Sequence, residues 1–255
     1  MKWNRQTKSA VFATLGYTAA LELMLAAAIL YWPAFREHTG ALKALAGPIP
    51  MLKDMIVQLE DKGAVAYVLS QHFFKGCNVL GVAAATLFAV GAVAGEAHRG
   101  TLEIFLMRPI SRRRLLTERF VVGALQVIVP IFLTTLTIPF FLARVDEAAT
   151  LPGFLLGAVH QSLFLLCLYA LSFFLSTLGR TPLKLAFGVL IFAIFNFSMY
   201  MVKTVTHYSL FRLADIQTFL DVYEKGPPWS LWAGFVVTIA ALFGASLWVF
   251  ERRVP

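Results

Sequence analysis

Five long apolar stretches constrain the fold of this chain more than any other feature. They cover residues 9–32, 120–142, 153–178, 182–202 and 229–250. A helix of about 20 apolar residues, rising roughly 1.5 Å per residue, crosses the roughly 30 Å hydrocarbon core of a bilayer. Each stretch is long enough for one crossing. Only 14% of the residues are charged, against about a quarter in soluble domains, so the sequence predicts an integral membrane protein.

A sixth apolar stretch, residues 64–95, is too long for one simple crossing, because its 32 residues would form a helix of about 48 Å. We expect residues 73–95 to cross and residues 64–72 to stand outside. The first stretch exceeds the roughly 7–15 apolar residues of a cleavable signal peptide, so we expect it to be retained. The predicted fold is an all-α membrane protein with six transmembrane helices, forming a single domain over residues 1–255.

The distribution of charge predicts the orientation of these spans. With both termini inside, the inner segments hold 13 Lys and Arg against four Asp and Glu, and the outer segments hold eight against nine. Basic residues in short loops favour the cytoplasmic side, so we expect both termini in the cytoplasm. The net charge of +8 therefore follows from membrane orientation and anionic lipid, and does not indicate nucleic-acid binding.

Two polar stretches on the predicted outer side have helical periodicity. Within residues 33–63, apolar positions recur from Met51 to Leu59, and within residues 203–228 they recur from Leu213 to Tyr223. This spacing is typical of amphipathic helices that lie at a membrane surface. We expect small outer helices in both places.

The polar stretch between spans two and three, Glu96 to Arg119, contains several residues that indicate where helices begin and end. Residues 97–107 are compatible with a half-apolar helix, which Arg108-Pro109 should end, because a residue before proline disfavours the α conformation. Ser111 can cap the following helix. That helix would begin with three arginines, 112–114, although a helix N-terminus disfavours cations by about 0.3–1 kcal/mol each. We expect a lipid phosphate or a partner to compensate for this cost.

No enzyme motif is found. The sequence has no G-x-x-x-x-G-K-[ST], H-E-x-x-H or G-x-S-x-G pattern, and its cysteines and histidines lack the spacing of metal ligands. We therefore expect no catalytic, cofactor-binding or metal-binding residues in this chain. Two charges lie in or near the spans, Glu22 and Lys75. Because ionisable groups at bilayer depth are costly, they are candidate pathway residues, with helix packing or snorkelling as the alternative.

The stretch between spans two and three resembles the cytoplasmic segment of type-2 ABC exporter permeases. The matching residues are Glu96-Ala97-His98-Arg99-Gly100-Thr101-Leu102-Glu103 and Leu106-Met107-Arg108-Pro109-Ile110-Ser111-Arg112. The family pattern is an acid, Gly-Thr, a short apolar helix, and Arg-Pro-hydrophobic-Ser-Arg. Six spans, cytoplasmic termini and small outer helices before the last span fit the family as well. A second acid often precedes Gly-Thr in the family and is absent here.

The resemblance implies that this stretch is a short cytoplasmic coupling helix that docks on a separate ABC ATPase subunit. The interface residues implied are Glu96, Arg99, Gly100, Thr101, Glu103, Arg108, Pro109, Ser111 and Arg112, with the charged ones forming a polar rim. ATP and Mg would be bound by the partner ATPase, and a second permease chain, forming a homodimer, would complete the pathway in a bacterial inner membrane. An ion-coupled secondary transporter using Glu22, and an intramembrane enzyme, are the alternative interpretations.

Overall fold

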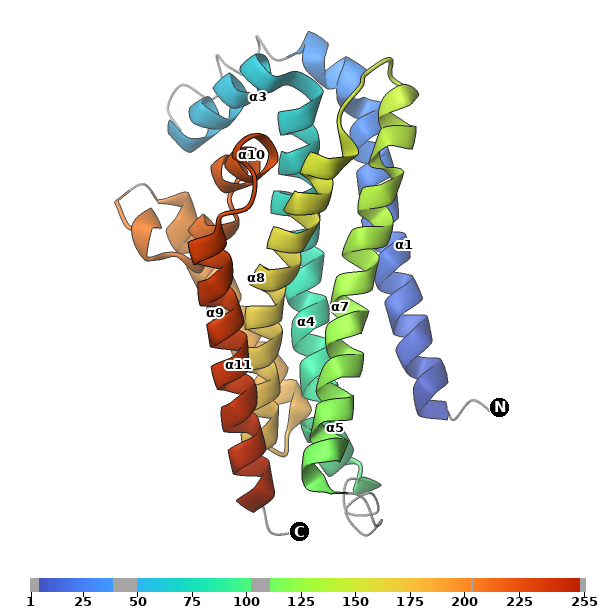
Figure 1. Cartoon of the computed structure of the whole chain (residues 1–255), viewed down its shortest axis with the longest axis vertical. Helices are drawn as coiled ribbons and strands as arrows, with labels where there is room; N and C mark the ends of the chain where they lie inside the picture. Colours follow the sequence, from blue (N-terminus) through green and yellow to red (C-terminus); the bar gives the residue numbers. More distant parts are fainter. Residues whose placement is uncertain (1–4, 39–49, 102–110, 203, 253–255) are drawn as a thin grey trace. The chain divides into compact units, whose positions relative to one another are not determined.

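The computed structural model describes residues 5–38, 50–101, 111–202 and 204–252, which form helices joined by turns, with no β-strand among them (Figure 1). Six helical stretches in this described part are long and apolar enough to cross a membrane. They are Ala10–Glu37, Ile56–Ala92, Arg112–Ala143, Leu151–Leu178, Pro182–Met201 and Trp229–Arg252. The predicted class, an all-α membrane protein with six spans, is confirmed.

Contacts divide the chain into two compact units, each built from three segments. The first unit comprises Met1–Val79, Pro130–Gln161 and Phe195–Pro227, and the second comprises Leu80–Val129, Ser162–Ile194 and Pro228–Pro255. Helices α4 (Asn78–Ala92), α7 (Arg112–Ala143), α8 (Leu151–Leu178) and α9 (Pro182–Met201) contribute residues to both units. The single domain over residues 1–255 stays a prediction.

In the first unit, α1 (Arg5–Glu37) packs against α3 (Pro50–Val68) and the π-helix η1 (Leu69–Cys77). The rings of Trp32 and Phe35 both lie 4.9 Å from that of Tyr67, measured between centroids. Gly63, with a φ of 57°, bends the backbone inside α3, so the first part of α3 is a separate amphipathic piece, as predicted. The candidate span begins at Ile56, earlier than the predicted residue 73, because the helix continues through this bend and the π-helix.

The connection before the last span also belongs to the first unit. It contains the short 3₁₀ helices η2 (Thr206–Tyr208) and η3 (Leu210–Ala214), followed by α10 (Ile216–Lys225). Asp215 caps α10 by accepting a 2.8 Å hydrogen bond from the Thr218 N–H, and burial raises the pKa of this carboxyl above its usual value. A salt bridge of 2.7 Å from Lys62 to Glu224 holds α10 against α3. The small helices predicted before the last span are therefore present.

In the second unit, α5 (Ala94–His98), α9 and α11 (Trp229–Arg252) accompany the inner parts of α4, α7 and α8. An aromatic cluster forms part of its core: the ring of Phe120 lies 5.2 Å from Tyr169, 5.1 Å from Phe173 and 4.4 Å from Phe243. The Tyr169 hydroxyl donates a 3.1 Å hydrogen bond to the Phe120 carbonyl. A Cβ at Gly123 would overlap this hydroxyl, so glycine is required for α7 and α8 to approach each other.

Candidate functional site

The predicted coupling segment, residues 96–112, is described at its two ends. Glu96, Arg99, Gly100 and Thr101 follow α4, and Ser111 and Arg112 begin α7. The other predicted interface residues, Glu103, Arg108 and Pro109, lie outside the described residues. All of the described positions belong to the second unit, so the site can be built from contacts within that unit.

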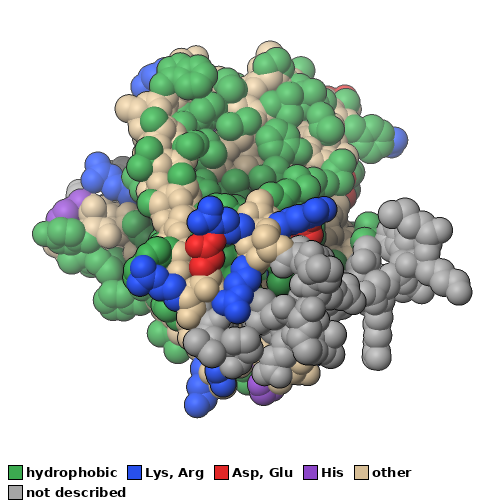
Figure 2. All heavy atoms as spheres, turned by 60° about the horizontal axis from the view of Figure 1, so that its bottom comes forward, with side chains coloured by type: hydrophobic (Ala, Val, Ile, Leu, Met, Phe, Trp, Pro, Cys, Tyr) green, Lys and Arg blue, Asp and Glu red, His purple; other side chains and the backbone are tan. Residues whose placement is uncertain are grey.

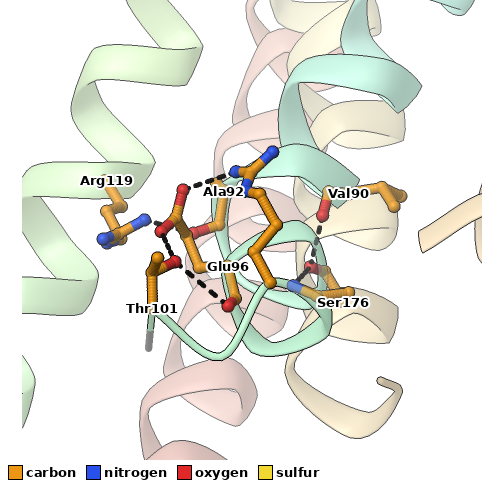
Figure 3. Close-up of polar contacts among 8 residues, drawn as sticks. Val90, Ala92, Glu96, Thr101, Arg119 and Ser176 are labelled. Atoms are coloured by element: carbon orange, nitrogen blue, oxygen red, sulfur yellow. Dashed lines mark hydrogen bonds and ion pairs between the residues drawn. The ribbon is translucent and has the colours of Figure 1, made fainter. Parts of the chain in front are cut away.

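A break between α4 and α5 sets the direction of the chain entering the segment. The backbone turns at Val93, with φ −122° and ψ −60°. The hydroxyl of Ser176, on α8, lies in this break (Figure 3): it accepts a 2.8 Å hydrogen bond from the Ala94 N–H and donates one of 3.2 Å to the Val90 carbonyl. In an unbroken helix these two backbone groups would bond each other. Ser176 is therefore inserted into the hydrogen-bond ladder, which is a recognised cause of a kink.

Glu96 is the centre of the next set of contacts. The residue is only 4% exposed, and its carboxylate accepts a 2.6 Å hydrogen bond from Arg99 and another from the Thr101 hydroxyl (Figure 3). Burial by itself raises the pKa of this carboxyl. The hydrogen bonds from Thr101 and Arg99 and the charges of Arg119 and Arg99 outweigh burial, so the net pKa lies below its usual value of 4.5. Glu96 is thus ionised at neutral pH. Its buried carboxylate holds Arg99 and Thr101 in place and is not presented to solvent.

Arg119, on α7, connects that helix to the end of α4. Its guanidinium donates a 2.6 Å hydrogen bond to the carbonyl of Ala92, the last residue of α4. Carbonyls at a helix C-terminus lack partners within the helix, so this contact satisfies one of them and adds a favourable cation at the negative end of the helix dipole. The sequence places Arg119 at the end of the polar stretch but does not predict its contact, and it gives no signal for Ser176. Neither residue belongs to a local motif.

The helix predicted over residues 97–107 does not run unbroken through its first residues. Helix α5 ends at His98, and Gly100 has a φ of 68°. This left-handed conformation is accessible to glycine at little cost and is a common end of a helix. A Cβ at Gly100 would meet no described atom within 4 Å. The positive φ therefore explains why glycine is favoured at position 100. No close contact among the described residues requires it.

The other end of the segment begins α7 as predicted. The Ser111 side chain accepts a 3.3 Å hydrogen bond from the Arg114 N–H, so the predicted cap is confirmed. Arg112 donates a 3.0 Å hydrogen bond to the backbone carbonyl of Glu251, and Arg113 pairs with the Glu251 carboxylate. Glu251 lies in the last turn of α11, where the helix dipole is negative. The sequence predicted that a lipid phosphate or a partner would offset the cost of placing arginines at a helix N-terminus. Part of that compensation comes from Glu251 at the end of α11 in the same chain.

Basic side chains gather on the face to which this site belongs. Figure 2 shows this face, with Lys and Arg side chains grouped around acidic ones. The exposed charged residues of the second unit include Arg99, Arg113, Arg114, Arg180 and Arg252, with Glu118 and Glu251. An excess of exposed cations suits an acidic partner or anionic lipid.

The two candidate pathway residues lie in the first unit, and the structure does not bring them into one site. Glu22 is half-buried on α1, with no hydrogen bond or ion pair to any described residue. Lys75 is exposed on η1 and lines an open groove of about 420 Å³. The other residues lining the groove are Met24, Ala27, Ala28, Tyr31, Phe35, Tyr67 and Gln71. Among the described residues, no group of three or more His, Cys, Asp and Glu side chains could hold a metal ion.

Comparison with known proteins gives one family. The family model described as "ABC-2 family transporter protein" matches residues 8–253. No curated protein and no solved structure matches the chain. The match covers all six candidate spans completely, together with the segment containing Glu96 and Arg112.

Proposed function

Because the chain belongs to the ABC-2 transporter family, we propose that it is the permease subunit of an ATP-driven exporter. Membership makes it a multi-pass ABC transporter membrane subunit without an ATPase site of its own, and implies an ABC ATPase as partner. The proposal adds that ATP and Mg bind on this partner, and that hydrolysis there is coupled through residues 96–112 to the export of a substrate.

The observation that best supports this coupling route is the anchoring of the segment at both ends. At its start, Glu96 bonds Arg99 and Thr101, and the adjacent break is held by Ser176 of α8. At its end, the first turn of α7 bonds Glu251 of α11. A displacement of the segment by a bound ATPase would therefore be transmitted to several spans through short polar contacts and not through a loose loop.

We expect the assembled transporter to contain two copies of this chain in a bacterial inner membrane. One chain supplies six candidate spans, and we expect two copies to pair about a two-fold axis with two ATPase chains. Charge asymmetry supports cytoplasmic termini, which would place the basic face toward the ATPase. A bacterial inner membrane is the expected location. Lys75 is the better candidate of the two pathway charges, because it lines the groove beside α1 and Glu22 is not among the residues lining that groove.

The coupling proposal is tested by adding bulk at Gly100. We expect Gly100→Leu to reduce association with the ATPase and the permease's effect on ATP turnover, because the side chain would alter the segment where it leaves α5. The assay is purification of the full chain from its native membrane in mild detergent, followed by mass spectrometry of the ATPase retained and measurement of ATP hydrolysis.

Gly226→Leu is the matched control. Gly226 also has a positive φ, 90°, with no described atom within 4 Å of a Cβ, but it lies in the first unit after α10. Backbone strain alone would affect both variants. Normal ATPase binding and turnover in Gly100→Leu, or equal losses in the two variants, would contradict the coupling assignment. Transport by the chain without any ATPase would contradict the exporter proposal itself.

A further inference from the structure

A groove with two arginines lies in the second unit, where α8, α9 and α11 reach their ends. Its volume is about 370 Å³, and the groove is wide open. The groove is lined by Thr177, Leu178, Arg180, Trp248, Val249 and Arg252. The first two end α8, Arg180 lies in the turn before α9, and the last three belong to the final turns of α11.

The arginines of this groove differ from others on the same face. Arg113 and Arg114 each form a salt bridge with a carboxylate. Neither Arg180 nor Arg252 has an acidic partner in the part of the chain that the structure describes. The guanidinium of Arg252 instead lies over the indole ring of Trp248, 3.9 Å from its centroid, which fixes its plane while leaving its N–H donors available.

Helix dipoles give a simpler explanation for each arginine taken singly. A cation in the last turn of a helix is favoured by the helix dipole, and this accounts for Arg252 at the end of α11. Arg180 lies two residues beyond Leu178, the last residue of α8, so the dipole of α8 favours a cation there as well. The dipoles do not explain why both arginines line one groove. The guanidinium fork matches phosphate oxygens in a bidentate geometry. Two guanidinium groups lining one groove therefore indicate a phosphate-bearing anion.

The apolar surroundings favour a lipid over a soluble phosphate. Leu178 is 56% exposed and Trp248 57% exposed, and Leu183 in the first turn of α9 is 69% exposed. These side chains lie at the ends of candidate spans, where headgroups meet acyl chains and where tryptophan is enriched. A soluble phosphate would contact the arginines and leave this apolar surface in water.

We propose that the groove binds an anionic phospholipid. Arg180 and Arg252 hold its phosphate oxygens, and Trp248 and Leu178 contact the glycerol region and the upper acyl chain. In the predicted orientation the groove faces the cytoplasmic leaflet, whose anionic lipids attract basic residues by about 1 kcal/mol each, which corresponds to about fivefold in affinity per arginine. The site depends on neither the transported substrate nor the coupling route.

The test is native mass spectrometry of the purified full chain after exchange into phosphatidylglycerol or phosphatidylcholine. We expect the wild type to retain phosphatidylglycerol preferentially. The double variant Arg180→Gln, Arg252→Gln should bind it about 25-fold more weakly, as the product of the two single effects. Arg114→Gln is the matched control, because it removes the same charge from the same face but outside the groove, and it should leave retention unchanged.

The alternative outcomes decide against the proposal. Equal losses in Arg114→Gln and the double variant would mean that only surface charge matters. Displacement of the lipid by inorganic phosphate at a similar concentration would identify a soluble anion site. A double variant that keeps the lipid but loses the ATPase would assign the arginines to a protein contact. If the double variant does not fold, Arg180→Lys with Arg252→Lys keeps the charge but removes both forks, and unchanged retention there would overturn the proposal.

Discussion

The inserted hydroxyl of Ser176 gives the sharpest test of how the site is built. Ser176→Ala removes the group that bridges the Ala94 N–H and the Val90 carbonyl. Val90, Ala94 and Ser176 are at most 2% exposed, so water cannot readily replace the hydroxyl. Each buried backbone group left unsatisfied costs about 1–3 kcal/mol. With two groups, the loss is roughly 2–6 kcal/mol if the backbone stays bent.

The helix has one way to recover part of this energy. If α4 and α5 straighten, the Val90 carbonyl can accept directly from the Ala94 N–H, as in a regular helix. The stability loss would then be smaller, but the start of the coupling segment would move away from α8. We therefore expect Ser176→Ala either to lower the thermal unfolding temperature of the purified permease or to reduce ATPase coupling at near-normal stability.

Ser172→Ala is the control. Ser172 lies one turn earlier on the same helix and is equally buried, and among the described residues its hydroxyl donates only to the Leu168 carbonyl within α8. Its removal should cost at most about 1 kcal/mol, because the backbone carbonyl keeps its helical hydrogen bond. Thermal unfolding in detergent and ATP turnover with the partner should be measured on both variants. Indistinguishable results for Ser172→Ala and Ser176→Ala would refute the bridging role.

Three further outcomes are expected. In a cysteine-free background, a cysteine at Arg180 should resist a membrane-impermeant thiol reagent in intact cells and one at Asp146 should react; the opposite pattern would reverse the orientation. Glu22→Gln should lower transport without affecting ATPase binding if this carboxylate acts in the pathway, whereas unchanged transport would leave it a packing role. The lowered pKa of Glu96 means that its stabilisation is complete above about pH 4.5 and is lost as the pH falls further. Glu96→Gln should therefore flatten the dependence of unfolding temperature on pH below that value, and an unchanged dependence would show that Glu96 does not contribute.

The spans and the small helices could be predicted because their signals are local. Apolar length defines a crossing helix, and helical periodicity identified α10 before its contacts were known. The cap at Ser111 required only one residue type at a helix start. In each case the information lies within about one helix of sequence.

The contacts that hold the site were not predictable in the same way. Ser176 lies 82 residues from Ala94, and Glu251 lies 138 residues from Arg113. No sequence pattern around a serine in an apolar helix predicts which groups it will hydrogen-bond. The partners of Ser176 follow from the packing of α8 against the end of α4. The burial of Glu96 was also missed, because an acid in a polar stretch is typically solvated.

The contact between the start of α7 and the end of α11 has a consequence for biosynthesis. Spans are made in order, so Arg113 leaves the ribosome 138 residues before Glu251. During that interval the arginine cluster lacks this carboxylate, and in the predicted orientation we expect its cations to keep the loop in the cytoplasm. Once the last span has been made, Glu251 pairs with Arg113. The arginines then also hold the start of α7 against the end of α11. A chain shortened before Glu251 would lack the partner of Arg112 and Arg113 at the start of α7.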